Sequence, residues 1–380
     1  MFGREDEKSM QYKYNDKQKR IYKSIKELAQ KQLNCDVELR SKYKLCADFG
    51  ILASMMPVSV GGLANCSSDI LCTAKMLGEL IEDSGFVLTI NNSMILASYL
   101  LPEFADEALC NEFCPGLKDG TLIGAYAITE PQSGSDVYSM NTRVVSNHNH
   151  ITLNGSKTYI TNGAIADVFV VVCRNEEDAY TAVLLKKEDQ GVSVGKEIKK
   201  MGLDTNPMAE IYFSNCTVPK SRIIGSYSGG QLISNMVLDW ERCLSFASHL
   251  GTMKKVMEQC IIYANQRIQF GKNIGSFQLV SEKIARMRIN VELGELLLFK
   301  ICDMKDNKKK TFLESAIFKY FIGEHYAGTC LDALQIFGAY GYCQESEIER
   351  AVRDSLGAKI YSGTSEIQLD IIARMLGVKK

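Results

Sequence analysis

The spacing of the hydrophobic residues changes twice along this chain, and this change constrains the fold most. From residue 15 to about 120, apolar side chains recur every three to four positions, as in helices that bury one face. Between about 122 and 226 the spacing falls to two, in β-branched and aromatic runs such as D-V-F-V-V-V-C-R. After Gly229 and Gly230 the helical spacing returns. We therefore predict an α+β chain with an N-terminal helical domain (1–121), a central β domain (122–228) and a C-terminal helical bundle (229–380).

Composition narrows the class of function. The 380 residues are 46% hydrophobic and 23% charged, which is ordinary for a globular protein with a sizeable core. The net charge of −1 gives no basic footprint for nucleic acid or an anionic membrane surface. We see no apolar run near the roughly 18 residues that span a bilayer, and the start M-F-G-R-E-D-E-K is too charged for a signal peptide.

The cysteines and histidines do not predict a metal site. The chain has 13 cysteines without a C-x-x-C pair, and only four histidines. His148 and His150 lie in the polar stretch S-N-H-N-H-I, which is typical of a turn between strands. Scattered cysteines without a signal peptide suit a reducing cytoplasm, where they act as small apolar core residues.

Nucleotide-binding motifs of the common kinds are missing from the sequence. No G-x-G-x-x-G follows a predicted strand, and no G-x-x-x-x-G-K-[ST] occurs. A dinucleotide would therefore have to be held in another way.

Five short blocks contain the residues best suited to chemistry. They are A-Y-A-I-T-E-P-Q-S-G-S-D (125–136), N-G-S-K-T-Y-I-T-N-G (154–163), Q-R-I-Q-F-G-K-N-I-G-S-F-Q-L (266–279), Q-I-F-G-A-Y-G-Y (335–342) and I-Y-S-G-T-S-E-I-Q (360–368). Taken singly, they read as polar loops, a hairpin and a helix end. Together, in this order and spacing, they resemble the acyl-CoA dehydrogenase family, flavoenzymes that oxidise the Cα–Cβ bond of acyl thioesters. The resemblance implies that family's fold, with a C-terminal four-helix bundle, and FAD as cofactor.

The resemblance also assigns cofactor-binding residues. It places beside the flavin ring Tyr126, Ile128, Thr129, Tyr159 and Thr161, and it places Ser135 between the flavin and the pantetheine arm. It assigns to the diphosphate and adenosine Arg267, Phe270, Gln278, Gln335 and Gly338, and it adds Thr364 and Glu366 from the last block. Because Arg267 and Gln278 would serve the flavin of a neighbouring subunit, a homo-oligomer is expected, either a dimer or a tetramer.

The catalytic base needs a separate argument. In many family members the residue between Tyr and Gly of the last block is the catalytic glutamate, but here it is Ser362, which cannot take a proton from carbon unaided. Glu241, in L-D-W-E-R-C-L-S-F, lies on or beside an apolar helical stripe. Its spacing alone favours a helix-flank glutamate paired with a neighbouring cation.

The resemblance reverses that interpretation. A minority of the family carries the base on this helix and a small residue at the other site. It therefore implies that Glu241 is the base and that the Ser362 backbone N–H serves the thioester carbonyl. Arg242 is then a contact for the pantetheine or phosphate arm, with a structural ion pair as the alternative.

The substrate class stays open between three hypotheses. Residues 239–253 and 206–210 resemble dehydrogenases of polyketide and nonribosomal peptide pathways. This favours a short amino- or hydroxyacyl group, such as seryl, on an acyl carrier protein, giving an aminomalonyl- or hydroxymalonyl-type extender unit. The alternatives are a degradative short- or branched-chain acyl-CoA dehydrogenase and a non-catalytic FAD-binding scaffold. Electron-transfer flavoprotein is the family's usual electron acceptor.

Overall fold

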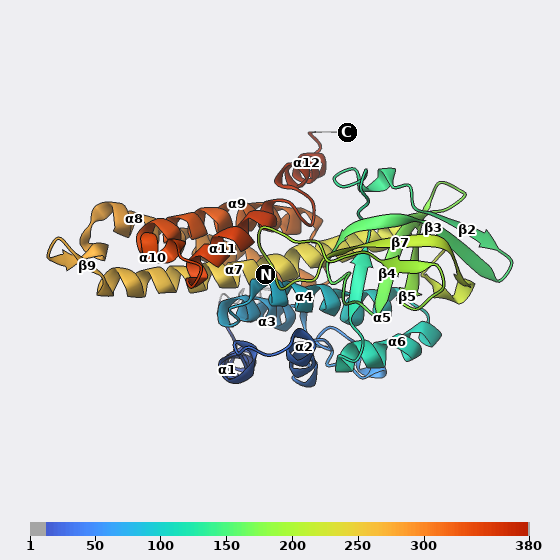
Figure 1. The fold of residues 1–380 in the computed structure, drawn as a ribbon, viewed down its shortest axis with the longest axis horizontal. Coiled ribbons are helices and arrows are strands. Elements are labelled where there is room, and N and C mark those ends of the chain that lie inside the picture. Colours follow the sequence, from blue (N-terminus) through green and yellow to red (C-terminus); the bar gives the residue numbers. More distant parts are fainter. Residues whose placement is uncertain (1–12, 379–380) are drawn as a thin grey trace, which may run out of the picture.

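The computed structural model describes residues 13–378, so the charged start at 1–8 lies outside the described residues. The N-terminal part is helical (Figure 1). Its helices are α1 (Asp16–Leu28), α2 (Leu39–Asp48), α3 (Ser67–Leu80), α4 (Ser84–Ile95), α5 (Leu101–Phe104) and α6 (Glu107–Asp119).

One helical stretch departs from the sequence-based expectation about apolar runs. Residues Ser84–Phe104 form a continuous helix of 21 residues, in which a π-helical segment, Leu96–Leu100, joins α4 to α5. By length and composition it could cross a membrane, so the expectation that no run is long enough was wrong. Its apolar window is 89% buried inside the protein. The buried core helix of a globular protein can have the same length and composition. In Ser84–Phe104 the polar residues Asn91 and Ser93 are also buried.

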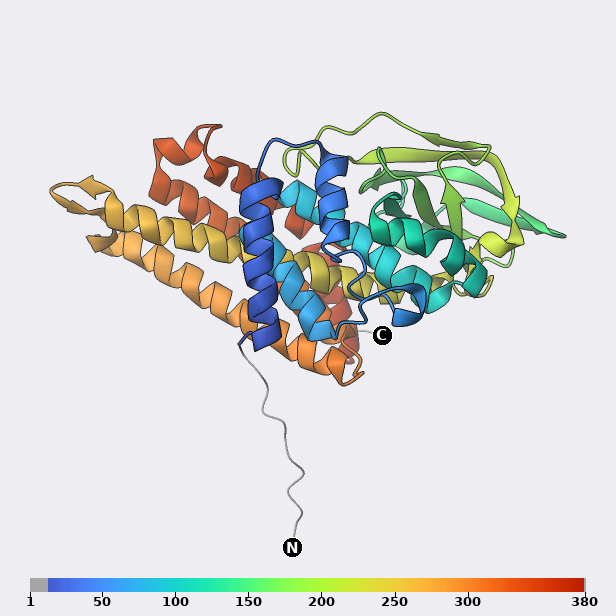
Figure 2. The same ribbon diagram turned by 90° about the horizontal axis from the view of Figure 1, so that it is seen from below.

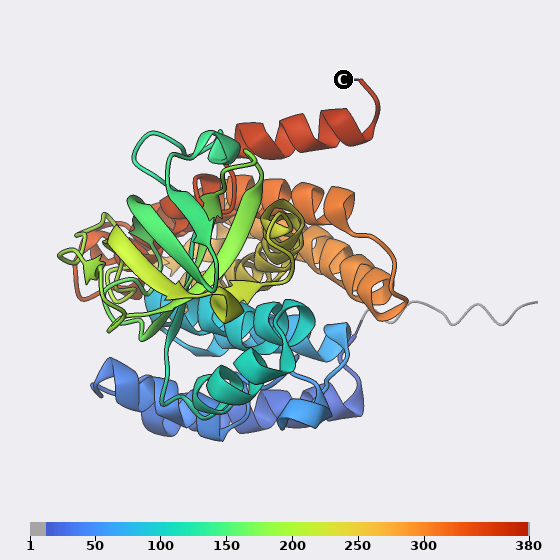
Figure 3. The same ribbon diagram turned by 90° about the vertical axis from the view of Figure 1, so that its right-hand side faces the viewer.

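The central part is a mixed sheet. Its strands are β1 (Gly124–Ala127), β2 (Arg143–Asn147), β3 (His150–Ile160), β4 (Val168–Arg174), β5 (Tyr180–Lys186), β6 (Val192–Val194), β7 (Ala209–Pro219) and β8 (Ile223–Ile224). Their order is β6-β7-β3-β2-β4-β5-β8, and β1 pairs with β4 in parallel. Figure 3 shows the sheet end-on, with the N-terminal helices along one side and α12 on the other.

Strand β4 explains how the β domain attaches to the helices. Alternate side chains of a strand point to opposite faces. One set, which includes Val168 and Val170, joins the core shared with the helices. The other set, which includes Phe169 and Val171, joins a second core that lies within the β domain. Both faces of β4 are therefore buried, which is why its sequence is a continuous apolar run.

The C-terminal part consists of long helices. They are α7 (Gly230–Gln266), α8 (Gln278–Asp306), α9 (Phe312–Phe337), α10 (Ala339–Tyr342), α11 (Glu347–Leu356) and α12 (Ser365–Met375). A small hairpin, β9 (Ile268–Gln269) with β10 (Lys272–Asn273), caps the far end of α7 and α8. Figure 2 shows these helices as an arm that reaches away from the β domain.

Two glycines fix how α7 packs against α3. A Cβ atom at Gly78 would lie 1.8 Å from the Ser248 carbonyl oxygen, and one at Gly251 would lie 2.0 Å from the Lys75 carbonyl oxygen. The backbones can approach this closely only because both residues lack a side chain. The Thr252 hydroxyl then donates to the Gly78 carbonyl at 3.1 Å. This contact sets the rotation of α7 and therefore the direction in which Glu241 points.

Candidate active site

The carboxylate of Glu241 meets the loop that carries Ser362. The Ser362 hydroxyl donates a hydrogen bond of 2.8 Å to Glu241 Oε1. Arg242 Nε and Gln368 Nε2 each donate to the Ser362 carbonyl oxygen at 3.2 Å. Ser362 itself has a left-handed backbone, with φ of 59°. These bonds hold a tight turn directly over the side chain of Glu241.

Burial makes Glu241 a stronger base than an exposed carboxylate. Its side chain is half-buried, and desolvation raises its pKa above the ordinary value. The hydrogen bond from Ser362 and the charge of Arg242 act in the opposite direction. The net effect is a raised pKa, and the hydrogen bond from Ser362 and the charge of Arg242 still stabilise the ionised carboxylate.

Two tyrosines from different parts of the chain also converge here. Tyr126, on β1, donates to the Ser234 hydroxyl at 2.9 Å, and Tyr361 is hydrogen-bonded to His249. Burial is the main cause that raises the pKa of each tyrosine, and the nearby charge of Glu241 raises both further. The β domain, α7 and the loop before α12 therefore surround one carboxylate.

The residues that the sequence placed beside a flavin ring lie at one end of the sheet. The Thr158 amide donates to the Thr129 carbonyl at 2.9 Å, which joins the ends of β1 and β3. Tyr159 has a left-handed backbone (φ of 56°), and its side chain is 61% exposed. Thr161 is half-buried and Ser135 is exposed.

This end of the sheet suits a flat aromatic cofactor. An exposed aromatic ring offers a stacking face, and the hydroxyls offer polar contacts to a ring edge. Beside Ser135, a Cβ atom at Gly134 would meet nothing within 4 Å, so there is open space at this loop. Ile128, by contrast, is buried in the core and contributes packing.

The start of α12 contains two more of the predicted residues. The Thr364 hydroxyl caps this helix by accepting from the Ile367 amide at 3.4 Å. Glu366 is exposed in the first turn, where a backbone N–H lowers its pKa. Both lie within four residues of Ser362, and their contact with a cofactor stays a prediction.

The remaining predicted cofactor residues lie far from Glu241 of the same chain. Arg267 caps the end of α7, and Phe270 lies in the turn of the β9–β10 hairpin that follows. The helical rise places Arg267 about 39 Å from Glu241 along α7. Phe270 is 93% exposed. The Tyr263 ring stacks on Phe337 with centroids 4.3 Å apart, which brings the end of α9 to the same place. This far group comprises Arg267, Phe270, Gln278, Gln335 and Gly338.

Comparison with known proteins identifies the family. The family model for the acyl-CoA dehydrogenase C-terminal domain matches residues 228–377, and the model for the middle domain matches residues 125–216. This chain belongs to the acyl-CoA dehydrogenase family. It is an FAD-dependent oxidoreductase of that family, so the predicted fold, enzyme class and cofactor are confirmed.

Three proteins are similar to this chain over nearly its whole length. L-prolyl-[peptidyl-carrier protein] dehydrogenase of Pseudomonas fluorescens is 32% identical over 380 residues, which cover 97% of this chain and 100% of that protein. The crystal structure of the prolyl acyl carrier protein oxidase AnaB superposes with a TM-score of 0.93 at 34% identity, covering 96% of this chain and 100% of that chain. The FAD complex of PigA gives a TM-score of 0.95 at 30% identity, covering 98% and 100%.

Sequence reasoning missed Tyr361, whose pKa the nearby charge of Glu241 helps to raise, and two buried residues beyond it in this dehydrogenase, His249 and Lys319. His249 is buried, and burial lowers its pKa to about 3, so it is neutral where it meets Tyr361. Lys319 is buried, donates to the Ala358 carbonyl at 3.0 Å and has a pKa lowered to about 8, chiefly by burial. The only sequence signal for Tyr361 was its place beside Ser362 in the last block. His249 and Lys319 gave no signal, because their partners lie 112 and 39 residues away.

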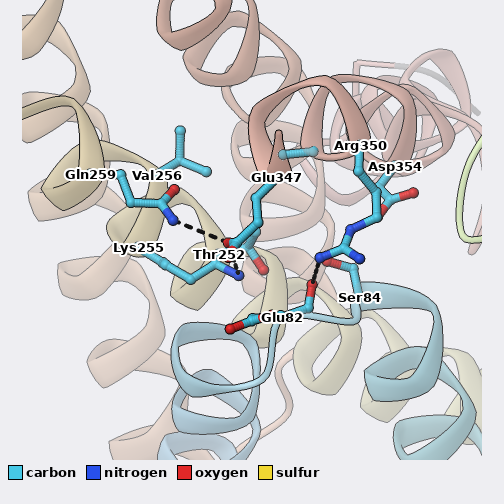
Figure 4. Close-up of a pocket in the computed structure, with 10 residues that line it drawn as sticks. Glu82, Ser84, Thr252, Lys255, Val256, Gln259, Glu347, Arg350 and Asp354 are labelled. Carbon is cyan, nitrogen blue, oxygen red and sulfur yellow. Dashed lines mark hydrogen bonds and ion pairs between the residues drawn. The ribbon is translucent and has the colours of Figure 1, made fainter. Parts of the chain in front are cut away.

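A cavity lies away from this site, between α7, α11 and the start of α4 (Figure 4). It holds about 10 Å³, which is room for a single water molecule. Gln259 donates to Glu347 at 3.1 Å, and Arg350 donates to the Glu82 carbonyl at 2.9 Å. The cavity is therefore a polar contact between helices rather than a substrate site. Within residues 13–378 there is no group of three or more His, Cys, Asp and Glu side chains suited to a metal ion.

Proposed function

We propose that this chain removes the α-proton and a β-hydride from a short aminoacyl thioester tethered to a carrier protein. One observation carries the proposal: a half-buried Glu241, with its pKa raised by burial, is bonded at 2.8 Å to the Ser362 turn. In this arrangement Glu241 takes the proton from the α-carbon. In the same proposal, the Ser362 amide donates to the thioester carbonyl, where negative charge develops. FAD, when bound, supplies the acceptor for the hydride.

The chemistry balances without another catalytic group. The C–H bond at the α-carbon breaks as its proton moves to Glu241, and the β-hydrogen leaves with its electron pair. The product of an L-prolyl thioester is an enamine, which tautomerises to a cyclic imine. The product of a seryl thioester is an enol, which tautomerises to an aldehyde. Both require only one base and one hydride acceptor.

The acyl group is proposed from the relatives. Two of them are named for prolyl groups on carrier proteins, and their alignments cover nearly the whole of this chain. None of the relatives reported above is named for a seryl group. We therefore place the prolyl thioester first and keep the seryl thioester as the second substrate to be tested.

The far group of residues supports a homo-oligomer. Arg267 and its neighbours cannot reach the Glu241 site of their own chain, because about 39 Å of α7 lies between them. They can contact a flavin only if a second subunit brings its site to them. Arg267→Ala should then lower the FAD content of the purified oligomer. Arg286→Ala, at an exposed arginine paired with Glu282 on α8, is the matched control and should retain FAD.

The location and the electron acceptor are also part of the proposal. Ten of the 13 cysteines are buried as free thiols, which supports a reducing cytoplasm. Electron-transfer flavoprotein is proposed as the acceptor from the family resemblance alone.

The test compares carriers and acyl groups directly. The holoenzyme is mixed in a stopped-flow instrument with prolyl and seryl groups on a phosphopantetheinylated carrier protein, and with aliphatic acyl groups on CoA. Bleaching of the flavin should be fastest with the prolyl carrier protein. Equal or faster bleaching by aliphatic acyl-CoA, with no response to either carrier-bound group, would assign the chain to degradative metabolism. No bleaching by any thioester would favour the non-catalytic scaffold.

A further inference from the structure

We propose that His249 is a positioning residue of this reaction, which acts through Tyr361 to hold the Ser362 turn against Glu241. This role rests on the proposed function, because it concerns the base of that same reaction. The helical rise places His249 about 12 Å beyond Glu241 along α7, so it can influence the base only through a residue between them.

The segment that precedes α12 is attached to the helical bundle along its whole length. Its start is held by Lys319 on α9, which donates to the Ala358 carbonyl at 3.0 Å. Its end is held at the Ser362 carbonyl, which accepts one bond from α7 and one from α12, each of 3.2 Å. Between these points the Tyr361 hydroxyl is hydrogen-bonded to His249. Because Tyr361 directly precedes Ser362, the place of its ring sets one side of the turn.

The ring of His249 is itself held in one orientation. It stacks on the Tyr326 ring of α9, with centroids 5.1 Å apart and planes 20° apart. It meets the Phe246 ring edge-on, with centroids 5.2 Å apart. A buried ring packed in this way cannot turn without disturbing its neighbours. His249 therefore offers its Nε2 atom to Tyr361 at a fixed place.

His249 acts by hydrogen bonding rather than by charge. Burial, together with the charge of Lys319, lowers the pKa of His249 to about 3, so the ring is neutral at working pH. The charged groups around the contact are Glu241 itself, Arg242 on the same helix, Lys319 on α9 and Asp354 on α11. A neutral side chain in place of His249 therefore changes none of these charges.

Loss of the contact should displace the turn. A phenolic hydroxyl left unpaired among packed side chains is costly, so the Tyr361 ring would move toward water and carry Ser362 with it. The bond of 2.8 Å from the Ser362 hydroxyl to Glu241 would then weaken. That bond favours the ionised carboxylate, so the pKa of Glu241 would rise.

The experiment removes the contact from either side. His249→Leu removes the imidazole, and Tyr361→Phe removes only the hydroxyl. His249→Gln retains an amide that can hydrogen-bond to Tyr361. His325→Leu is the matched control, because it makes the same change at another histidine of the bundle, which packs on Phe321 with centroids 4.5 Å apart. Each variant is also made together with Ser362→Ala.

Two measurements are made on each holoenzyme. The first is kcat/KM for flavin reduction as a function of pH. The second is the titration of the Glu241 carboxylate, taken from infrared difference spectra between each variant and the same variant carrying Glu241→Gln. The second measurement needs no turnover, so it tests the positioning role even if no thioester is oxidised.

His249→Leu and Tyr361→Phe should each raise the pKa of Glu241 by about 0.5–1 unit and move the rise of kcat/KM to higher pH. His249→Gln and His325→Leu should leave both unchanged. Together with Ser362→Ala, His249→Leu should cause no further shift, because the bond to Glu241 is already absent.

The proposal would be overturned if His249→Leu lowered the rate equally at every pH, since that result would show a structural role only. It would also fail if the shift were just as large with Ser362→Ala in place, or if His249→Gln behaved as His249→Leu does. Should His249→Leu not fold, Tyr361→Phe decides by the same criteria. A shift in the infrared titration without flavin bleaching by any thioester would refute the proposed function and leave the positioning role standing.

Discussion

Removing the Ser362 hydroxyl should shift the pH dependence of the reaction rather than abolish it. The hydroxyl donates to Glu241 Oε1 at 2.8 Å and so stabilises the ionised carboxylate, which lowers its pKa. Ser362→Gly removes this bond and also suits the left-handed backbone, with φ of 59°. Ser362→Ala removes the same bond but keeps a side chain. The two variants therefore separate the hydrogen bond from backbone strain.

The size of the shift follows from the strength of the bond. A hydrogen bond to a charged group contributes about 1.5–3 kcal/mol when well buried. Glu241 is half-buried, so water replaces part of the lost bond, and about 1.4 kcal/mol remains as the difference between the two protonation states. This corresponds to about one pKa unit. The pKa of Glu241, already raised by burial, should therefore rise by about one further unit.

The assay is kcat/KM for flavin reduction as a function of pH. Glu241 must be ionised to accept the α-proton, so the rate rises with pH through its pKa. Both variants should move this rise to higher pH by about one unit. At pH values below the rise they should be about tenfold slower than the unmodified enzyme, and above it they should be nearly equal.

Ser365→Ala is the matched control, because Ser365 donates to Glu324 at 2.6 Å in the same segment without touching Glu241. Its pH profile should not move. The reasoning would be refuted if the Ser362 variants lost activity equally at every pH, since that result would assign the hydroxyl a structural role. It would also fail if Ser362→Ala shifted the profile and Ser362→Gly did not.

Three other perturbations test the site and the fold. Glu241→Gln should leave the FAD content and the melting temperature unchanged but slow flavin reduction by about a hundredfold to ten-thousandfold, and a loss below tenfold would contradict its role as the base. Gly251→Ala should lower the free energy of unfolding in a denaturant titration by about 2 kcal/mol or more, because the added Cβ atom would collide with the Lys75 carbonyl. Gly328→Ala is the control: its added Cβ atom would meet nothing within 4 Å, so this variant should be slightly more stable than the unmodified protein. Burial raises the pKa of Asp354 to about 6, so its carboxyl group binds a proton more tightly in the folded state than in the unfolded state. The free energy of unfolding should therefore fall by up to about 3 kcal/mol as the pH rises from about 4 to about 6. Asp354→Asn should flatten that dependence, and melting temperatures measured across this range would show whether it does.

The sequence predicted what depends on local spacing. The apolar run of β4 indicated a strand, and the position of Glu241 between Val237 and Leu244 indicated a carboxylate beside an apolar stripe. Both inferences needed only residues a few positions apart. The resemblance then supplied the role of Glu241, which spacing alone had assigned to a helix-flank ion pair.

What the sequence could not predict depends on contacts between distant segments. The Ser362 hydroxyl reaches a carboxylate 121 residues away, and Asp239 binds three side chains 66 to 76 residues away. Such pairs leave no periodic signal. The length of the apolar helix at 84–104 was underestimated for a related reason. Its asparagines and serines interrupt the apolar letters, yet they are buried because they hydrogen-bond within the core, as Asn91 does with Ser248 at 2.7 Å.

The contact between positions 241 and 362 also explains why the base can reside at either one. A side chain from α7 and a side chain from the turn before α12 meet at hydrogen-bond distance, so a carboxylate from either backbone position can lie near the same place. Two carboxylates there would share a proton, and the second would be forced to remain neutral. A glutamate at one position is therefore best paired with a small residue at the other. A serine at the second position does more than leave room, because its hydroxyl neutralises part of the cost of burying the ionised base.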